Sequence, residues 1–530
     1  MSPIVTNDMK STGLRLLKKG RRGLLRTVFS RAGLILLFLL LQVALLAMGF
    51  GRLRAYMPHY YTINLIFSTV MALFLLNSSQ DASAKITWII VIMALPSFGA
   101  LLFFYTQSDL GHRLLKQRFT RLAEETRDKI PQEEAVLDRF QAASPEAVGL
   151  HRYINRTGCY PVFDRSSVSY FPLGDEVFPE LLQQLEAAEK FIFLEFFIVE
   201  EGLMWGKVLE ILARKAGEGV DVRLIYDGTC EFLTLPRSYP KRLAELGIQC
   251  KVFAPVTPFV STYYNYRDHR KILVIDGHTA FTGGVNLADE YINAVKRFGH
   301  WKDTAIMVKG EAVRSFTLMF LQMWNLDERE PVFEEAYLDA PARPPEDARG
   351  FVMPYGDCPL DEERVGEWVY MDILNRARDY VYIMTPYLIL DGEMETAIKF
   401  AAERGVDVRL ILPGIPDKKL PYALAKTHYA SLLRSGVRLY EYTPGFVHAK
   451  GFVCDGREAV VGTINLDYRS LYHHFECAAY MQDVACIEEI RRDFLETQAF
   501  CRTVTPETLK EEKWRVKFAG VIMKVIAPLL

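Results

Sequence analysis

Two segments of the chain carry the same side chains at the same spacing, and these side chains can act on a phosphate ester. Residues 269–276 read HRKILVID and residues 448–455 read HAKGFVCD, so a Lys follows each His by two positions and an Asp by seven. An Asn stands ten positions after each Asp. The candidate side chains are His269, Lys271, Asp276 and Asn286 in the first segment and His448, Lys450, Asp455 and Asn465 in the second.

The spacing indicates what this set can do. Each segment is predicted to be a strand, in which alternate residues share a face, so His and Lys project to the same side. The glycines that follow, at 283, 284 and 462, let backbone approach a ligand, and the Asn then returns to the site. The two lysines and two amides would bind phosphoryl oxygens. One neutral imidazole would attack phosphorus and the other, protonated, would donate to the leaving alcohol. No metal or other cofactor is needed, and histidines in opposite protonation states predict a bell-shaped pH profile.

Two further pairs of acidic residues have different predicted roles. Each imidazole needs an orienting acid, and Asp303 and Glu476 are the candidates, although Asp303 lies seventeen residues after its Asn and Glu476 eleven after its own. Asp276 and Asp455 are open to two interpretations. They are catalytic, as their place in the repeated segment suggests, or they order a turn, as Asp commonly does.

The positioning elements follow from the rest of the chain. From about residue 161, short apolar runs alternate with helical runs, which is typical of an α/β fold. The sequence GVDVRLI occurs at both 219–225 and 405–411, ahead of the two candidate segments. The chain is therefore predicted to contain two copies of one α/β unit, each a mixed sheet flanked by helices, packed about a pseudo-twofold axis.

The duplicated HxKxxxxD pattern is that of the phospholipase D superfamily, which the chain resembles over about residues 165–500. Four narrower segments resemble bacterial cardiolipin synthases: YRDHRKI at 266–272, GGVNLADEY at 283–291, PGFVHAK at 444–450 and NLDYRS at 465–470. An apolar N-terminal region ahead of two catalytic repeats is similar as well, although many members have two spans and this chain has three apolar stretches.

The resemblance implies two phospholipase D-like repeats that condense two phosphatidylglycerol molecules into cardiolipin and release glycerol. It implies a covalent phosphatidyl-histidine intermediate on His269, with His448 as general acid and then base. Exchange of one phosphodiester for another needs no nucleotide. A hydrolytic phospholipase D or another phosphatidyltransferase shares the motif and remains an alternative, and an inactive membrane scaffold is a remote one.

Composition limits the class of partner. The formal net charge of −2 gives no basic excess, which argues against a general nucleic-acid binder. The eight cysteines show no metal-site spacing, and half of the 530 residues are apolar, which suits a membrane portion.

Three apolar stretches, at 32–50, 60–76 and 86–105, predict a membrane region, and the first and third are long enough to span it. Basic residues precede the first stretch and follow the third, so both flanks favour the cytoplasm. Two spans with a partial insertion at 60–76 would satisfy both, and we expect a multi-pass cell-membrane protein with a cytoplasmic catalytic part.

The expected organisation has seven segments. The C-terminal segment is predicted to be an amphipathic helix, either packed on the catalytic core or lying on the lipid surface. In order, the segments are 1–31 (basic N-terminus), 32–105 (membrane region), 106–160 (charged connector), 161–330 (first repeat), 331–349 (acidic, Pro-rich linker), 350–510 (second repeat) and 511–530 (C-terminal helix).

Overall fold

The computed structural model describes residues 57–78, 80, 82–95, 99–100, 102–103, 110–255, 266–339, 345–361 and 363–527. The chain divides into two compact units. The larger, called the catalytic unit below, comprises mainly residues 115–255 and 265–523. The smaller comprises residues 18–114 with two short segments, 256–264 and 524–530.

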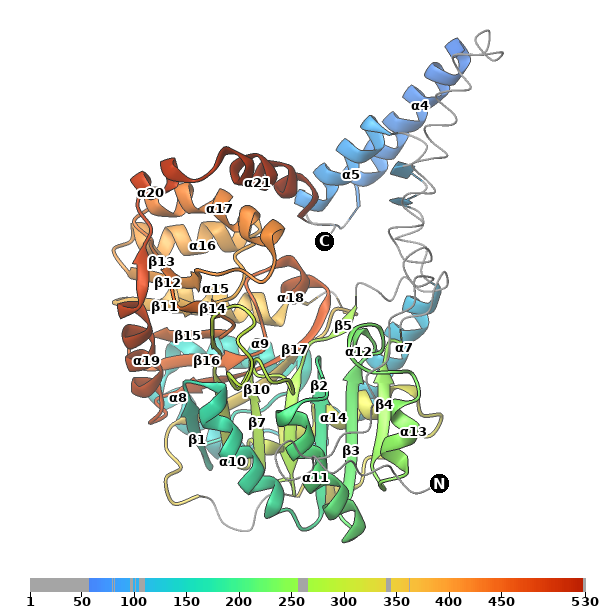
Figure 1. Cartoon of the computed structure of the whole chain (residues 1–530), viewed down its shortest axis with the longest axis vertical. Helices are drawn as coiled ribbons and strands as arrows, with labels where there is room; N and C mark the ends of the chain where they lie inside the picture. The colour runs from blue at the N-terminus through green and yellow to red at the C-terminus, as the bar shows by residue number, and fades with distance from the viewer. Residues whose placement is uncertain are drawn as a thin grey trace. The chain divides into compact units, whose positions relative to one another are not determined.

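The catalytic unit contains two mixed β-sheets whose strands follow the same order, as the predicted duplication requires (Figure 1). The first sheet is β1 (Ser166–Phe171), β9 (Ala305–Gly310), β7 (Thr279–Gly283), β6 (Lys271–Ile275), β2 (Phe191–Phe196), β3 (Asp221–Asp227) and β4 (Gln249–Phe253). The second is β10 (Phe351–Asp357), β17 (His474–Gln482), β16 (Glu458–Gly462), β15 (Gly451–Cys454), β11 (Tyr380–Met384), β12 (Asp407–Pro413) and β13 (Arg438–Tyr442), with β18 (Cys501–Thr503) added at the edge.

Strand directions match as well. β2, β3 and β4 are parallel in the first sheet, as are β11, β12 and β13 in the second, while the remaining neighbours are antiparallel. The repeated GVDVRLI sequence forms the start of β3 and of β12. Every residue of β2, β6, β7, β16 and β17 is buried. These strands are covered on both faces, and their polar residues, such as Lys271 and Glu476, are buried together with the apolar ones.

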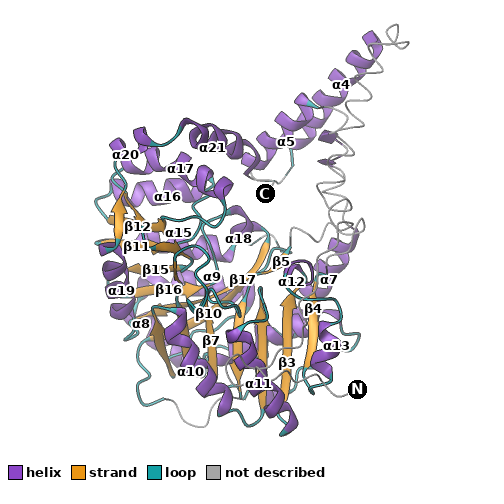
Figure 2. Cartoon of the chain, viewed as in Figure 1, coloured by secondary structure: helices purple, strands orange, loops and turns teal. Residues whose placement is uncertain are grey.

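Helices cover the sheets (Figure 2). Before and within the first repeat they are α7 (Leu110–Glu125), α8 (Glu134–Ala143), α9 (Val148–Gly158), α10 (Gly174–Glu186), α11 (Leu203–Gly217), α12 (Thr229–Leu233), α13 (Tyr239–Ala244) and α14 (Val313–Trp324). In the second they are α15 (Val365–Arg376), α16 (Gly392–Glu403), α17 (Lys419–Arg434), α18 (Tyr468–Tyr472), α19 (Ile487–Ala499), α20 (Pro506–Glu511) and α21 (Trp514–Ile526). α14 is buried along almost its whole length, because it packs on the first sheet on one side and on β10 of the second repeat on the other.

Two short strand pairs join the repeats, and they position the site. β5 (Arg267–Asp268) pairs in parallel with β17, and β14 (Gly445–Val447) pairs in parallel with β8 (His300–Lys302). Each repeat thus lends the segment before its HxK pattern to the other repeat. Such a reciprocal exchange is what an approximate twofold axis between two similar units produces.

The smaller unit contains α4 (Met57–Leu76) and α5 (Ala82–Ala94), which pack through an apolar cluster that includes Met71, Leu75, Trp88 and Ile92. The predicted single span at 86–105 is wrong in its extent. α5 ends at Ala94, two residues before Pro96, and its thirteen residues cover only about 20 Å of the roughly 30 Å of a bilayer core. Within the described ranges, no helix has the length and apolarity to cross a membrane. The stretch at 32–50 lies outside those ranges.

Candidate active site

The two histidines come from equivalent positions just before a central strand. His269 precedes β6, and His448 precedes β15. Strands β6 and β15 begin two and three residues after these histidines, and not at them as predicted. The reason is that the backbone of each histidine pairs with the opposite repeat. The backbone N–H of His269 donates to Phe475 O at 2.9 Å, and that of His448 donates to Lys302 O at 2.7 Å. Each histidine is therefore held by a strand of the opposite repeat.

The orienting acids are shared crosswise for the same reason. His269 Nδ1 lies 2.9 and 3.0 Å from the two carboxylate oxygens of Glu476 in the second repeat. His448 Nδ1 lies 2.6 Å from Asp303 Oδ2 in the first repeat. The exchanged strands set this register: Asp268 pairs with Phe475 and Val447 with Lys302, so each histidine stands opposite the acid one residue further on. Both carboxylates are completely buried.

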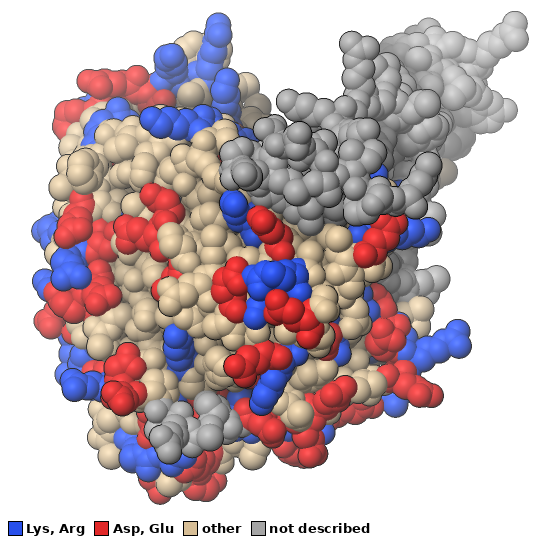
Figure 3. Space-filling model, turned by 60° about the horizontal axis from the view of Figure 1, so that its bottom comes forward, with Lys and Arg blue, Asp and Glu red and all other residues tan. Residues whose placement is uncertain are grey.

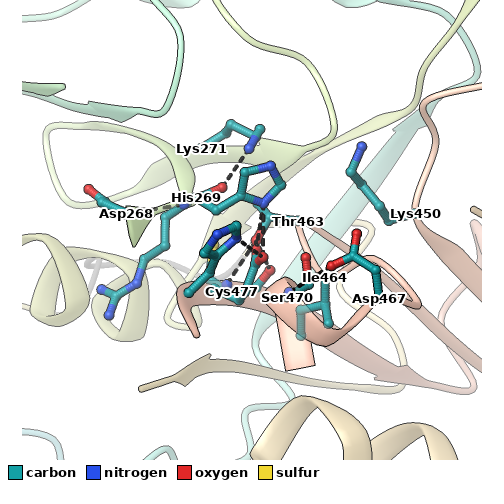
Figure 4. Close-up of polar contacts among 12 residues, drawn as sticks. Asp268, His269, Lys271, Lys450, Thr463, Ile464, Asp467, Ser470 and Cys477 are labelled. Atoms are coloured by element: carbon teal, nitrogen blue, oxygen red, sulfur yellow. Dashed lines mark hydrogen bonds and ion pairs between the residues drawn. The ribbon is translucent and has the colours of Figure 1, made fainter. Parts of the chain in front are cut away.

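These contacts select the tautomer of each ring. An ionised carboxylate only accepts hydrogen bonds, so Nδ1–H of each imidazole donates to its acid and Nε2 is left as the reactive nitrogen. Lys450 Nζ lies 2.8 Å from His448 Nδ1, but it donates instead to the backbone carbonyl of His448. Lys271 Nζ makes the equivalent hydrogen bond to His269 O at 2.5 Å. As predicted, His and Lys of each pattern reach the same place, and Figure 4 shows this for His269 and Lys271.

Burial and mutual repulsion shift the pKa values of these cations. The pKa of Lys271 falls to about 8 and that of Lys450 to about 7, mainly because burial disfavours the charged ammonium. Burial and the neighbouring lysines hold the pKa of His269 well below its usual value and lower that of His448 to about 4. Burial alone would raise the pKa of Asp303, but His448 and Lys450 outweigh it and lower that pKa.

These shifts qualify the expectation that the two histidines begin in opposite protonation states. Without an anion, both rings favour the neutral form, because they share a buried site with two lysines. The carboxylates of Asp303 and Glu476 offset the charges of the two lysines. A phosphate group placed between the rings would add further negative charge and raise the pKa of a neighbouring imidazole, so that one of the two can carry a proton.

The two predicted amides are not equivalent. Asn286 Oδ1 accepts from Ile198 N at 3.0 Å, and its Nδ2 donates to Tyr291 Oη at 2.9 Å. Asn465 is also buried, but its Oδ1 has no hydrogen-bond partner among the described residues. Asn465 Oδ1 is therefore open to accept a hydrogen bond from a ligand, while the hydrogen-bonding capacity of Asn286 is largely used by the protein.

The structure decides between the two interpretations of Asp276 and Asp455, and the catalytic one is wrong. Each lies at the end of its strand away from the histidine, about 20 Å along the chain. Asp276 accepts three backbone N–H groups, from Glu189, Lys190 and Phe191, at 2.7–2.8 Å. Asp455 accepts the three equivalent ones, from residues 378, 379 and 380, at 2.8–2.9 Å. Both adopt a positive φ, near 50°, which Asp tolerates. These carboxylates tie the strand end to the start of β2 or β11.

Sequence reasoning missed two residues that support the acids. A Cβ at Gly284 would lie 1.9 Å from Asp303 Oδ1, so only glycine leaves room for that carboxylate. The equivalent residue in the second repeat is Thr463, whose hydroxyl donates to Glu476 Oε2. Repeat one thus combines Gly with Asp, and repeat two Thr with Glu. The sequence predicts only that Gly284 lets backbone approach a ligand. The difference between Gly284 and Thr463 at equivalent positions is the signal that could have indicated their contacts with the acids.

A third imidazole, His474, also adjoins Glu476. Its Nδ1 lies 3.6 Å from Glu476 Oε1, and its ring centroid is 5.4 Å from that of His269. His269, His474 and Glu476 bring potential ligand atoms within 4.8 Å of one another, a geometry that could hold a cation. The same carboxylate already accepts from His269 and Thr463, so this cluster belongs to the orientation of His269.

Charge on the outer surface agrees with the low net charge. On the face drawn in Figure 3, the described Lys and Arg side chains are interspersed with Asp and Glu and form no continuous basic area.

Comparison with known proteins identifies the family. A family model described as "Cardiolipin synthase, PLD-like domain" matches residues 181–324 and 370–497. A Streptococcus mutans protein described as uncharacterized is 55% identical over 462 residues, which cover 86% of this chain and 99% of that protein. A cardiolipin synthase of Geobacillus kaustophilus is 33% identical over 509 residues, covering 92% and 99%.

Among solved structures, a phosphatidylserine synthase from Haemophilus influenzae matches with a TM-score of 0.53 at 15% identity, over 69% of this chain and 95% of that one. At that identity the likeness shows the fold alone. The family model and the relatives carry the assignment: this chain belongs to the cardiolipin synthase family of phospholipase D-like enzymes and is a phosphatidyltransferase.

Proposed function

We propose that this enzyme transfers a phosphatidyl group from one phosphatidylglycerol to another, forming cardiolipin and releasing glycerol. The observation that carries the proposal is the crosswise pairing of His269 with Glu476 and of His448 with Asp303. It brings two imidazoles with free Nε2 atoms and two lysines into one buried site. The membership in the cardiolipin synthase family supports the choice of lipid.

In the first step, His269 Nε2 attacks the phosphorus of one phosphatidylglycerol, and the bond from phosphorus to the glycerol oxygen breaks. A proton held by His448 passes to that oxygen, so glycerol leaves as a neutral alcohol. The phosphatidyl group is now bound to His269 through a P–N bond. Lys271, Lys450 and the Asn465 amide would hold the phosphoryl oxygens as charge develops.

In the second step, His448 removes the proton from a glycerol hydroxyl of the second phosphatidylglycerol, and that oxygen attacks phosphorus. The P–N bond breaks, cardiolipin forms and both histidines return to their starting states. One phosphodiester replaces another, so the reaction needs no nucleotide. The assignment of His269 as nucleophile rests on the family resemblance. We further propose that the apolar N-terminal region anchors the enzyme in the cell membrane, with the catalytic unit in the cytoplasm.

The test supplies the purified full chain with phosphatidylglycerol in mixed micelles, without nucleotide or added metal, and identifies products by mass spectrometry. Cardiolipin with equimolar glycerol is the expected result. Phosphatidic acid alone would show that water is the acceptor and that the chain is a hydrolytic phospholipase D.

His269→Ala and His448→Ala should each lower turnover by at least about a thousandfold, because each removes a group that makes or breaks a bond. His278→Ala is the matched control, since its side chain is 54% exposed and lies two residues beyond the structural Asp276. Near-normal turnover in either active-site variant would refute the assignment.

A further inference from the structure

The C-terminal helix α21 presents an apolar face to solvent. Trp514, Phe518, Val521 and Ile522 are 70%, 61%, 62% and 49% exposed. They recur at i, i+4, i+7 and i+8, so they form one continuous stripe. Scattered exposed apolar residues are ordinary on a soluble surface, but a contiguous stripe with an aromatic residue at two of its four positions marks a binding surface.

Packing on α17 decides which face points outward. A Cβ at Gly520 would lie 2.4 Å from the backbone oxygen of Ala423, so α21 rests on α17 in backbone contact at this glycine. Met523 is buried on the same side of the helix. The sequence allowed two interpretations of this segment, a helix packed on the catalytic core or a helix on the lipid surface. The helix packs on α17 only through the side that carries Gly520 and Met523, and the apolar stripe remains uncovered.

The charges beside the stripe indicate what would cover it. Lys513, Arg515 and Lys517 are exposed, and α21 contains no acidic residue. Protein–protein interfaces are depleted of Lys, whereas a helix with an apolar face and basic flanks is typical of one that lies in the interfacial plane of an anionic bilayer. Trp514, at the end of the stripe, has the ring preferred at that depth.

A second apolar and basic feature adjoins this helix. Leu420 is 53% exposed at the start of α17, one turn before the Ala423 contact, and Lys418 and Lys419 beside it are exposed. Lys418 and Pro421 line a recess together with Phe446, whose ring centroid lies 5.8 Å from that of His448.

We propose that α21 binds the surface of an anionic lipid bilayer, with its apolar stripe among the acyl chains and its lysines and arginine at the headgroups. This contact would bring the catalytic unit to the lipid surface. The proposal rests on the proposed function only in the choice of lipid, because binding requires no turnover.

The first experiment uses the full chain in vesicles of phosphatidylglycerol with brominated acyl chains, which quench tryptophan at short range. Comparison of the wild type with Trp514→Phe isolates the contribution of Trp514. We expect the substitution to remove a strongly quenched component, and Trp368→Phe on α15, where the ring is 41% exposed, to remove an unquenched one. Equal quenching in the wild type and Trp514→Phe would overturn the proposal, whether or not the protein makes cardiolipin.

The second experiment separates docking from chemistry. The double substitution Phe518→Ser with Ile522→Ser should lower transfer on phosphatidylglycerol vesicles by about tenfold, since two side chains lose their burial in the bilayer. Its turnover of a short-chain, monomeric phosphatidylglycerol should stay unchanged, which also shows that it folds. Phe400→Ser on α16, where the side chain is 52% exposed, is the control. Unchanged vesicle activity in the double variant would overturn the lipid assignment, and so would a loss of self-association as its only effect.

Discussion

The crosswise acid–histidine pairs allow a quantitative test through Asp303→Asn. The wild-type carboxylate accepts from His448 Nδ1 at 2.6 Å, which leaves Nε2 unprotonated and facing the reaction. An asparagine can present its NH2 group instead, in which case Nδ1 becomes the acceptor and the proton moves to Nε2. The neutral ring would then have no basic nitrogen where the second phosphatidylglycerol must be deprotonated.

Two physical effects predict different magnitudes. Loss of a charge-assisted hydrogen bond alone costs about 1.5–3 kcal/mol, or about 10- to 150-fold in rate. Reversal of the tautomer adds to this, and the same exchange in the serine-protease triad lowers kcat by about 10⁴. Because Asp303 is completely buried and water cannot replace it, we expect both effects and a fall in kcat of about 10³- to 10⁴-fold.

The assay is cardiolipin formation from phosphatidylglycerol in mixed micelles, with kcat at saturating lipid. Asp391→Asn is the matched control: this carboxylate is also buried, but it accepts from Met394 N as the cap of α16 and from Tyr472 Oη, and neither partner is a histidine of the site. It should retain nearly full activity. A decrease of less than about tenfold in Asp303→Asn would refute the orienting role of this acid.

Three further predictions follow from the geometry. Gly284→Ala should lower kcat by about a hundredfold, because its Cβ would displace the neighbouring carboxylate, whereas Gly392→Ala, with no atom within 4 Å, should not; equal activities would contradict this. Asp276→Ala should lower the free energy of unfolding by about 3 kcal/mol in thermal or denaturant titrations, since three backbone N–H groups lose their acceptor, yet the protein that remains folded should keep its kcat. In a pH series, kcat/KM should fall as the pH rises through the lowered pKa values of Lys450, about 7, and Lys271, about 8, because the deprotonated amines no longer attract phosphate; a plateau to pH 10 would show that these ammonium charges are not needed.

Local periodicity carried a large part of the fold. The alternation of apolar and helical runs and the two GVDVRLI sequences predicted two mixed α/β sheets with equivalent strands, and these are present as β3 and β12 in sheets of the same order. Such features depend on residues close in the chain, so the sequence displays them directly. The HxK spacing belongs to the same class, and the predicted convergence of His and Lys is confirmed at both copies.

The boundaries and roles that depend on distant contacts could not be obtained this way. The extent of the span at 86–105 was predicted wrongly, because the apolar composition continues past Pro96 whereas α5 ends at Ala94. The role of Asp276 depended on which backbone lay opposite the strand end, some 85 residues earlier in the chain.

By itself, the sequence determined the set of groups: two imidazoles, two lysine side chains and two candidate acids in a duplicated α/β framework. Only the tertiary structure decided how they combine. His269 finds its acid 207 residues away and His448 finds its acid 145 residues away, each in the other repeat. The physical reason is that β5 pairs with β17 and β14 with β8, in each case a strand of the other repeat, so neither repeat contains a complete acid–histidine pair of its own.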